Sequence, residues 1–418
     1  MAAFAVNACA APKITAQVIF GGQEVLKQCT EAWQELCDES RCPPFFRPEW
    51  IATYLKAFEP NSEVALFTAH CAESLLAVLP MVRKKVWYAG VPVTKLCGAA
   101  NVHSVRYGMV RSKSAAGKQA VPAIWNLIRQ GGTWDIVELP MVAEGCACGE
   151  LVELAQQDGY RTLTFPVQDS PVLHMTRDAD GKLTCLSGTN RHFRHELRRF
   201  GRLLEQIAGG KPRLLRFDHP EPSVMKQFYE LEAAGWKGNE GSAINCDPAT
   251  QSFYDAIAQE ASQRDYFSLH TLDVNGKMAA GAFSVTADDC FYPMKIAHNE
   301  EWRRGAPGHL LFNGILEDCA LRNIPELFFG GSKDRYKTAW TQDCIAHYDG
   351  LIFAPSLRGQ LAFHLRTQVM SRLGHWRRDF LAWKTRRKKS QKEKSKAAPS
   401  NAAAAAQNNH KIEGEGQS

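Results

Sequence analysis

The sequence has few of the features that mark membrane, secreted or metal-binding proteins. It contains no window of about 18 uninterrupted apolar residues, so we expect no membrane-spanning helix. Its first twelve residues, MAAFAVNACAAP, lack the basic start of a secretory signal. It also lacks a CxxC spacing, and its 13 cysteines are an odd, scattered set. We therefore predict a cytoplasmic protein with reduced thiols and no metal.

Two short spacings deserve a check against that prediction. Cys146 and Cys148 are two residues apart, and His192 and His195 are three apart. A zinc site needs about four ligands, and neither pair is accompanied by a second one at a suitable spacing. Neither pair therefore predicts a metal site.

Net positive charge is confined to the end of the chain. The formal charge of all 418 residues is +6, and residues 384–418 hold nine Lys or Arg against three Glu. The body up to residue 383 is therefore neutral. We expect 384–418 to be a disordered basic and Ala-rich tail. The apolar spacing in 364–383 predicts an amphipathic helix, which can lie at an anionic membrane surface or dock on the adjoining domain.

Length and punctuation predict two folded halves. Pro and Asp-Gly signals near 164–190 interrupt the apolar periodicity, so we place the halves at 14–175 and 176–356. Each half alternates strand-like and helix-like segments, which indicates an α/β (α+β) fold. In the second half, Asn275-Gly276 joins two strand-like runs as a hairpin. The strands near 345–354 are expected to close that half.

The most specific motif is EEWRRGAPGHLL, residues 300–311, between a predicted strand and a predicted helix. Arg303 and Arg304 precede Gly305 and Gly308 at the helix start. Backbone N–H groups and the helix dipole at such a start attract anions, for example a pyrophosphate. Taken alone, Gly-Ala-Pro-Gly also fits a tight turn that begins a helix without binding an anion. The surrounding pattern of strands and helices is therefore needed to choose between these two interpretations.

That pattern is a hairpin, a strand, an Arg-Gly loop, a helix and a strand, and it resembles the core of the GNAT N-acyltransferases. The loop is similar to that of a BioF-like acetyltransferase-domain family found with cellulose and exopolysaccharide synthesis proteins, through Trp302, Arg303, Arg304, Pro307, Gly308, Leu310 and Leu311. Four more segments carry this resemblance: 44–50, 191–204, 235–244 and 330–340.

The resemblance implies two GNAT-like units in tandem, laid out as in the Fem aminoacyl transferases. Only the second unit, with its core at about 194–335, is expected to keep the cofactor loop. The implied co-substrate is acetyl-CoA or another acyl-CoA, bound by Arg303, Arg304, Gly305, Ala306, Pro307, Gly308 and His309. A backbone N–H on the strand around Met294 to Ala297 would stabilise the oxyanion of the reaction.

Catalytic side chains are expected just after the strand PELFFGG, because α/β sheets present functional residues at the carboxyl ends of strands. Asp334, Tyr336 and Lys337 are the candidates there. By analogy with GNAT and Fem proteins, Tyr336 would protonate the leaving thiolate and Lys337 would contact an anionic acceptor. The segment also fits a capped helix with a solvated basic face.

A second cluster is expected to bind the acceptor. It comprises Trp236, Lys237 and Glu240 in the loop GWKGNEGSA, together with Lys295 on the strand that precedes the Arg-Gly motif. Two glycines bracket Trp236 and Lys237, so this loop can approach a ligand closely. The alternative is a core tryptophan beside a surface lysine.

The segment 191–202 has five arginines and one glutamate. This pattern favours a solvated helix face, with an acidic substrate or RNA as alternatives. Nucleic acid is not favoured, since the body is neutral and no RNA-binding signature with interleaved aromatics is present.

The sequence therefore predicts an acyl-CoA-dependent N-acyltransferase acting on an amino group of a sugar, polysaccharide or cell-envelope precursor. It would work in the cytoplasm or peripherally at the inner face of a membrane, held by the basic helix and tail. Two alternatives stay open. A Fem-type aminoacyl-tRNA-dependent transferase should bind tRNA with a steep salt dependence. A non-catalytic accessory protein of exopolysaccharide or cellulose assembly is suggested by the loop's departure from the common GNAT form.

Overall fold

A computed structural model describes residues 13–132, 134–184 and 191–368, without the side chains of Arg191 and Trp236. One compact unit extends to Gln360, and the residues after it form a second unit. Residues 357–368 are helical. The predicted tail at 384–418, and the predicted helix at 364–383 beyond residue 368, lie outside the described residues.

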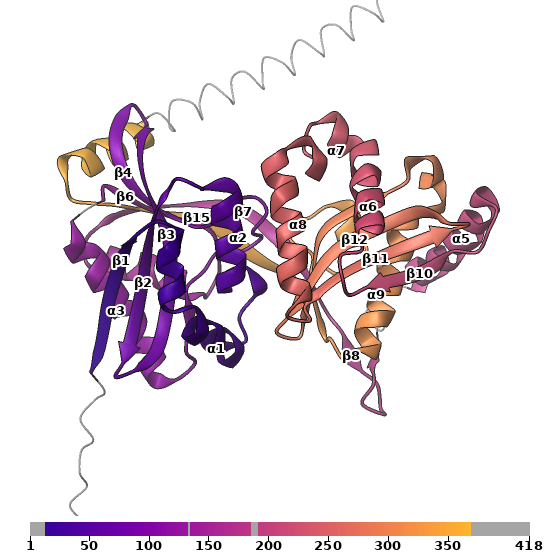
Figure 1. Ribbon diagram of the computed structural model, residues 1–418, viewed down its shortest axis with the longest axis horizontal. Helices are drawn as coiled ribbons and strands as arrows, with labels where there is room; N and C mark the ends of the chain where they lie inside the picture. Colours follow the sequence, from indigo (N-terminus) through magenta and orange to yellow (C-terminus); the bar gives the residue numbers. More distant parts are fainter. Residues whose placement is uncertain (1–12, 133, 185–190, 369–418) are drawn as a thin grey trace, which may run out of the picture. The chain divides into compact units, whose positions relative to one another are not determined.

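The first half contains a four-stranded antiparallel run followed by alternating helices and strands (Figure 1). Its helices and strands are β1 (Ile14–Gly21), η1 (Gln23–Gln28), α1 (Thr30–Ser40), η2 (Pro44–Phe46), α2 (Pro48–Phe58), β2 (Glu63–Cys71), β3 (Ser74–Tyr88), β4 (Val91–Gly98), β5 (Val110–Arg111), α3 (Ala115–Gly131), β6 (Ile136–Ala143), α4 (Ala147–Gln157) and β7 (Arg161–His174).

The second half repeats this order after a small hairpin. Its helices and strands are β8 (Thr176–Arg177), β9 (Leu183–Thr184), α5 (Arg191–Ala208), β10 (Arg213–Phe217), α6 (Pro222–Ala234), α7 (Trp236–Asn239), η3 (Ile244–Cys246), α8 (Pro248–Ser262), β11 (Phe267–Val274), β12 (Lys277–Ala287), β13 (Cys290–His298), η4 (Glu300–Gly305), α9 (Pro307–Leu321), β14 (Glu326–Phe328), α10 (Arg335–Thr338) and β15 (Cys344–Phe353).

The strands form one large mixed sheet in the order β1-β2-β3-β4-β6-β15-β7-β14-β13-β12-β11-β10, with β5 on β3. Neighbouring strands are antiparallel except at β4–β6 and β13–β14, which are parallel. These two pairs occupy equivalent positions in the two halves, each after a run of four antiparallel strands. The predicted α/β fold of two similar units in tandem is therefore confirmed.

The last strand differs from our expectation. We expected the strand near 345–354 to close the second half, but β15 lies between β6 and β7, where it pairs with both. The carboxyl end of β7 in turn pairs with β14. Each half thus completes the sheet of the other. The boundary between 175 and 176 stays a prediction, and this exchange means that it does not separate two closed sheets.

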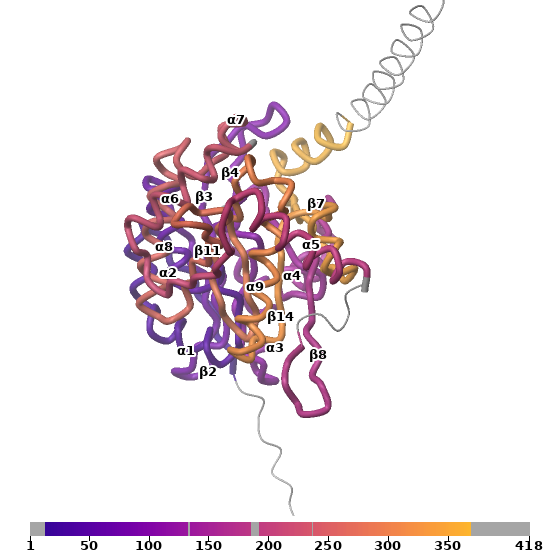
Figure 2. Tube along the Cα trace, turned by 90° about the vertical axis from the view of Figure 1, so that its right-hand side faces the viewer, coloured from indigo at the N-terminus to yellow at the C-terminus, as the bar shows by residue number. Residues whose placement is uncertain are grey.

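The two halves also share a core in which α2 lies beside α8 (Figures 1 and 2). The rings of Trp50 and Phe253 meet edge to face at 5.4 Å. Trp50 Nε1 donates a hydrogen bond to Ser104 Oγ at 3.1 Å, and Tyr266 Oη donates one to Glu49 at 3.0 Å. The bond to Ser104 also holds the 99–109 loop of the first half against α2, at the core that the two halves share.

Two local predictions can be checked directly. The hairpin between β11 and β12 turns at Asn275 and Gly276, with φ values of 50° and 78°, so it is confirmed. Among the helices that the structure describes, none is long and apolar enough to cross a membrane.

Candidate functional site

The site begins where β13 and β14 diverge. They pair only at Cys290–Glu326 and Phe291–Leu327, after which β13 continues alone beside β12. The β12–β13 register shifts here, because Phe283 faces Lys295 and Ser284 faces Pro293, which leaves Met294 as an extra residue. Proline has no N–H to donate to the ladder, so this irregularity falls where the sequence permits it. The backbone around Met294 is therefore available next to the point of divergence.

The Arg-Gly motif forms the turn between β13 and α9. Asn299 caps η4 by accepting a hydrogen bond from the Glu301 N–H at 2.9 Å. Ala306 has a φ of 46°, the left-handed conformation that lets the chain turn into α9. The N–H groups of His309 and Leu310 both bond to the Ala306 carbonyl, whereas the Gly308 N–H has no partner within the described residues.

Arg303 and Arg304 are exposed on this turn, and neither has an ion pair among the residues that the structure describes. Gly305 has a different role. A Cβ there would lie 2.9 Å from the Cα of Leu204, because α5 packs directly against η4. The turn therefore offers an anion two guanidinium groups and the Gly308 amide at a helix start, which is a suitable donor set for a pyrophosphate.

His309 lies in an aromatic cluster behind the turn. Its ring is 4.6 Å from that of Tyr336, 5.4 Å from Phe193 and 5.7 Å from Trp340. Burial, with a further contribution from His298, lowers the pKa of His309 to about 4. The imidazole is therefore neutral at pH 7, and it supports the turn by packing.

The three predicted catalytic residues belong to the loop and short helix after β14. Asp334 caps α10 by accepting a hydrogen bond from the Lys337 N–H at 2.9 Å. Lys337 Nζ donates to the carbonyls of Gly330 and Ser332 at 2.6 and 3.1 Å. Tyr336 Oη donates to the Gly308 carbonyl at 3.0 Å, which links this segment to the Arg-Gly turn. Burial raises the pKa of Tyr336 and lowers that of Lys337.

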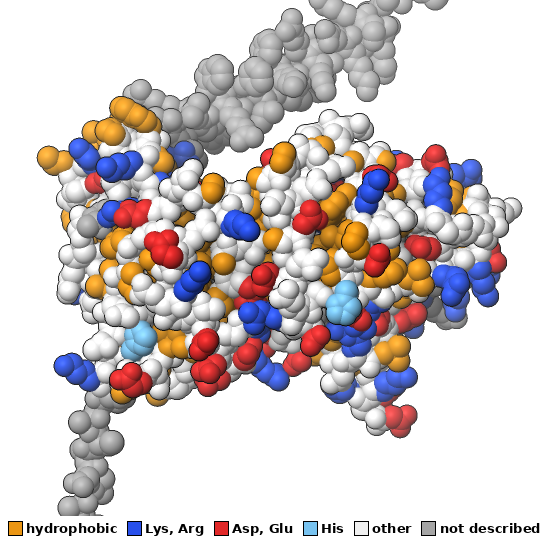
Figure 3. All heavy atoms as spheres, viewed as in Figure 1, with side chains coloured by type: hydrophobic (Ala, Val, Ile, Leu, Met, Phe, Trp, Pro, Cys, Tyr) orange, Lys and Arg blue, Asp and Glu red, His pale blue; other side chains and the backbone are white. Residues whose placement is uncertain are grey.

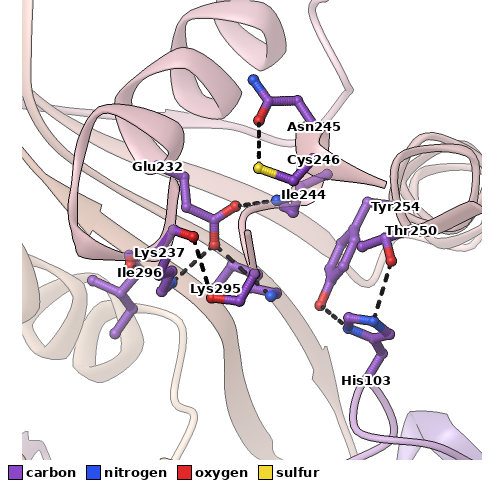
Figure 4. A network of polar contacts seen from close by, with 11 residues as sticks. His103, Glu232, Lys237, Ile244, Asn245, Cys246, Thr250, Tyr254, Lys295 and Ile296 are labelled. Carbon is purple, nitrogen blue, oxygen red and sulfur yellow. Dashed lines mark hydrogen bonds and ion pairs between the residues drawn. The ribbon is translucent and has the colours of Figure 1, made fainter. Parts of the chain in front are cut away.

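Two of the predicted acceptor residues, Lys237 and Lys295, lie in a polar network around Glu232 (Figure 4). The Glu232 side chain on α6 is fully buried. It accepts a hydrogen bond from Lys237 Nζ at 2.8 Å and from the Ile244 N–H at 2.9 Å. Lys237 also donates to the Ile296 carbonyl at 3.0 Å. This network ties α6, the loop after it and β13 together at the irregular part of the strand.

Lys295 joins the same network at a longer distance. Its Nζ is 3.8 Å from a Glu232 oxygen and 5.5 Å from the centre of the Tyr254 ring. Burial lowers the pKa of Lys295. Two lysines therefore face one buried carboxylate, and the network carries an excess positive charge beside the strand divergence.

The first half contributes His103 to this region. Its two ring nitrogens lie 3.4 Å from Thr250 Oγ1 and Tyr254 Oη, both on α8. Burial, with a smaller contribution from Lys295, lowers the pKa of His103 to about 4. Figure 4 shows this histidine reaching α8 from the loop of the first half.

The structure thus arranges the predicted residues in two groups. One group joins the Arg-Gly turn to Tyr336, and the other joins Lys237 to Lys295 through Glu232. Glu240 is exposed and outside both groups, and the side chain of Trp236 is not described. Sequence reasoning missed Glu232, Tyr254 and His103, since no spacing distinguishes one glutamate on a helix or one histidine in a loop.

Within the described ranges, no group of three or more His, Cys, Asp or Glu side chains could hold a metal ion. The groups near the strand divergence include cations, backbone amides, a buried tyrosine and a carboxylate. These groups can bind an anionic donor and move protons.

Comparison with known proteins agrees with this geometry. A family model described as an acetyltransferase (GNAT) domain matches residues 191–338. The solved structure of FemX is similar at 10% identity with a TM-score of 0.54, and the match covers 84% of this chain and 99% of that one. No curated protein matches the sequence significantly.

Two further solved structures are similar over most of the chain. One is the C-terminal domain of a putative lysylphosphatidylglycerol synthetase from Agrobacterium fabrum, at 11% identity and a TM-score of 0.48, covering 82% of this chain and 96% of that one. The other is a tandem GNAT protein from the clavulanic acid biosynthesis pathway, at 13% identity and a TM-score of 0.40, covering 82% and 99%. Residues 191–338 thus match a GNAT acetyltransferase domain, and the fold of the chain is similar to that of FemX.

Proposed function

We propose that the protein is an acyl-CoA-dependent N-acyltransferase whose reaction takes place where β13 and β14 diverge. The observation that carries this proposal is the Arg-Gly turn beside that divergence. Its exposed Arg303 and Arg304 and the unpartnered Gly308 amide are suited to the pyrophosphate of the donor. In the first half the segment that follows β4, residues 99–109, has no counterpart of the Arg303-Arg304-Gly305 motif. We therefore assign a single donor site, in the second half.

In the proposed reaction an acceptor amine attacks the thioester carbonyl, the C–S bond breaks, and the acyl group moves to nitrogen. The Met294 amide would donate to the developing oxyanion at the strand irregularity. Tyr336 would give its proton to the leaving thiolate, and its proximity to the Arg-Gly turn, shown by the hydrogen bond to the Gly308 carbonyl, is the observation that supports this role. Asp334 is the proposed base that takes the proton from the amine.

We assign the acceptor side to the surface between α6 and the end of β13, around a hollow lined by Glu232, Lys237, Ile296, His298 and Glu300. The hollow has a volume of about 20 Å³, enough for about one water, so the acceptor would lie over it and not inside it. Lys237 Nζ is held by Glu232 and by the Ile296 carbonyl. We therefore propose that Lys237 positions the wall of this hollow. Lys295 supplies positive charge behind it, and Glu240 and Trp236 would contribute from the adjacent loop. An amino-bearing sugar or cell-envelope precursor remains the proposed acceptor.

The first experiment is calorimetric titration of the full-length protein with acetyl-CoA, with desulfo-CoA as a second ligand and a version ending at residue 383 for comparison. We expect micromolar binding that the shortened protein retains. The double variant Arg304→Ala, Gly308→Ile should abolish binding, while Lys118→Ala, on an exposed turn of α3, should not. Undiminished binding by the double variant would remove the site assignment.

The proposed base has a particularly clean test, because asparagine caps helices as well as aspartate does. Asp334→Asn should therefore keep α10 folded and lower kcat by about 100-fold, the usual scale for loss of a general base. Tyr336→Phe tests the acid in the same assay. A kcat unchanged by Asp334→Asn would exclude this aspartate as the base.

The alternative function is Fem-type transfer from an aminoacyl-tRNA, which the fold similarity to FemX keeps open. That donor would require tRNA binding that weakens steeply with salt. Absence of acetyl-CoA binding together with such tRNA binding would favour it. Absence of both would favour a non-catalytic accessory role.

A further inference from the structure

The basic face of α5 is not used by the proposed reaction. Arg194, Arg198 and Arg202 are spaced by four residues, so they lie along one face and span about 12 Å. All three are exposed, and none has an ion pair within the described residues. Only Arg199, on a neighbouring row, is neutralised, by Glu196 at 2.7 Å. Figure 3 shows Lys and Arg side chains gathered where α5 and β10 lie in Figure 1.

The helix that bears this face packs on the proposed donor turn. The contact is made by its buried side, where a Cβ on Gly305 would lie 2.9 Å from Leu204. Arg303 and Arg304 are exposed on η4, the segment against which α5 packs. We refer to Arg194, Arg198, Arg202, Arg303 and Arg304 together as the basic surface. The basic surface has five arginines, which is more than the binding of one pyrophosphate at the Arg-Gly turn requires.

Arg194, near the amino end of α5, lines a hollow between the β8–β9 hairpin and the end of α9. The buried Leu183 and the 77% exposed Leu321 also line this hollow. Its charged lining is mixed, with Arg177 and Lys182 beside Asp178 and Glu317. The positive charge that would attract an acidic protein therefore lies on the exposed arginines of α5, and Leu321 adds an aliphatic contact next to them.

We propose that the basic surface docks a small acidic carrier protein that delivers the acyl group on its phosphopantetheine arm. The inference rests on the proposed function and adds to it a second donor for the same reaction, an acyl thioester on a carrier protein beside acyl-CoA. The bonds formed and broken are the same as with acyl-CoA. The amine nitrogen bonds to the acyl carbon, the C–S bond breaks, and the carrier's thiol takes the proton. A carrier-bound arm has no adenosine diphosphate, so its recognition must come from the protein that bears it.

The hollow argues for a protein and against RNA on the same face. Sequence-tolerant RNA binding uses exposed aromatic rings between the basic groups. On α5, Phe193 and Phe200 are instead directed toward the His309 cluster, at ring distances of 5.4 and 6.4 Å. The accessible apolar group is the aliphatic Leu321.

The test measures binding of a fluorescent acyl carrier protein, in its apo form and in its acetylated holo form, to the full-length protein at an ionic strength of about 0.1 M. Wild type should bind the holo form in the micromolar range and the apo form more weakly. The triple variant Arg194→Glu, Arg198→Glu, Arg202→Glu should weaken holo binding by about tenfold or more, because three attractive contacts become repulsive.

A matched triple variant, Lys56→Glu, Lys85→Glu, Lys118→Glu, makes the same change in net charge at exposed positions of the first half. It should leave carrier binding within about twofold, since charges beyond a Debye length of about 10 Å are screened. Acetyl-CoA titration of both triples separates the two proposals. Carrier binding lost by the α5 variant with acetyl-CoA binding kept supports the docking surface.

Equal weakening by both triples, or no binding of the carrier by a wild type that binds acetyl-CoA, would overturn the docking proposal and leave the proposed function standing. Binding of tRNA or of phosphatidylglycerol vesicles that depends on the α5 arginines, without carrier binding, would also overturn it. A wild type that binds neither acetyl-CoA nor carrier would contradict the proposed function itself.

Discussion

Glu232 is the side chain on which the acceptor side of the site depends. It is fully buried, and its carboxylate is compensated by Lys237, Lys295 and the Ile244 amide. Removing one partner of such a buried set leaves uncompensated charge in a medium of low polarity. The residue therefore combines a stabilising role with the positioning of two lysines beside β13.

We predict that Glu232→Ala lowers the free energy of unfolding by about 3–5 kcal/mol, the usual cost of breaking a buried ion pair. Urea denaturation measures it. Glu230→Ala, two residues away with a side chain that is 62% exposed, is the control and should change stability by less than about 0.5 kcal/mol. Equal effects of the two substitutions would mean that the Glu232 network contributes no specific stability.

His309 predicts a pH dependence of stability. Its pKa of about 4 in the folded protein lies below the ordinary value near 6.5 that it regains on unfolding. The unfolded chain therefore binds a proton first as the pH falls. The stability that His309 contributes is complete above pH 6.5 and is lost as the pH decreases toward 4.

Replacing His309 with Phe keeps the ring in its aromatic cluster and removes the titration. The slope of unfolding free energy against pH between 4 and 6.5 should become shallower by at most about 1.4 kcal/mol per pH unit, the limit for one proton. His174→Phe, at an exposed position on β7, is the matched control. If the slope stayed the same in His309→Phe, the lowered pKa of His309 would not be the source of this pH dependence.

At the scale of elements, the contact between α5 and η4 fixes the donor turn. Gly305 and Gly308 look equivalent in the sequence, yet they have different surroundings. A Cβ at Gly305 would lie within 3 Å of the α5 backbone, whereas one at Gly308 would meet only the Tyr336 ring at 3.8 Å. The first glycine serves helix packing, and the second, although buried, has room for a Cβ beside the Tyr336 ring.

We therefore expect Gly305→Ala to destabilise the protein by about 1–3 kcal/mol, the range for inserting a methyl group into a packed contact. Gly308→Ala should be close to neutral for stability. Thermal unfolding of the two variants gives the comparison. Similar melting temperatures for both would show that α5 can move away from η4 at little cost.

The sequence predicted these elements to different degrees. The hairpin at Asn275-Gly276 could be predicted because its turn chemistry is local. The chain turn before α9 could be predicted because Arg303, Gly305 and Pro307 occur together. The Glu232 network could not, since Lys295 lies 63 positions along the chain from Glu232 and no local pattern encodes their contact. The site of β15 was also beyond local reasoning, because an apolar run does not specify its sheet.

At the scale of the whole molecule, the exchange of β15 and the end of β7 makes the two halves interdependent. β15 pairs along its length with β6 and β7, so its removal would leave these two strands without a partner at the edges that now face β15. The shared core around Trp50 and Phe253 adds to this dependence. We expect one cooperative unfolding transition for the compact unit.

Two shortened proteins test this interdependence. A chain ending at Asp343 lacks β15 and should fail to fold, whereas a chain ending at residue 383 retains every described contact and should keep its melting temperature within about 2 °C. Circular dichroism and calorimetry provide the measurements. Cooperative unfolding of the chain that ends at Asp343 would show that the first half closes without β15.

The position of β15 also has a consequence for synthesis on the ribosome. The strands β6 and β7 are made long before the strand that fits between them, so both present open hydrogen-bonding edges while nearly 170 further residues are translated. Open edges of this kind are where nascent chains pair wrongly or aggregate. The first half must therefore wait, incomplete, for the end of the second, and its dependence on chaperones should be greatest during that interval.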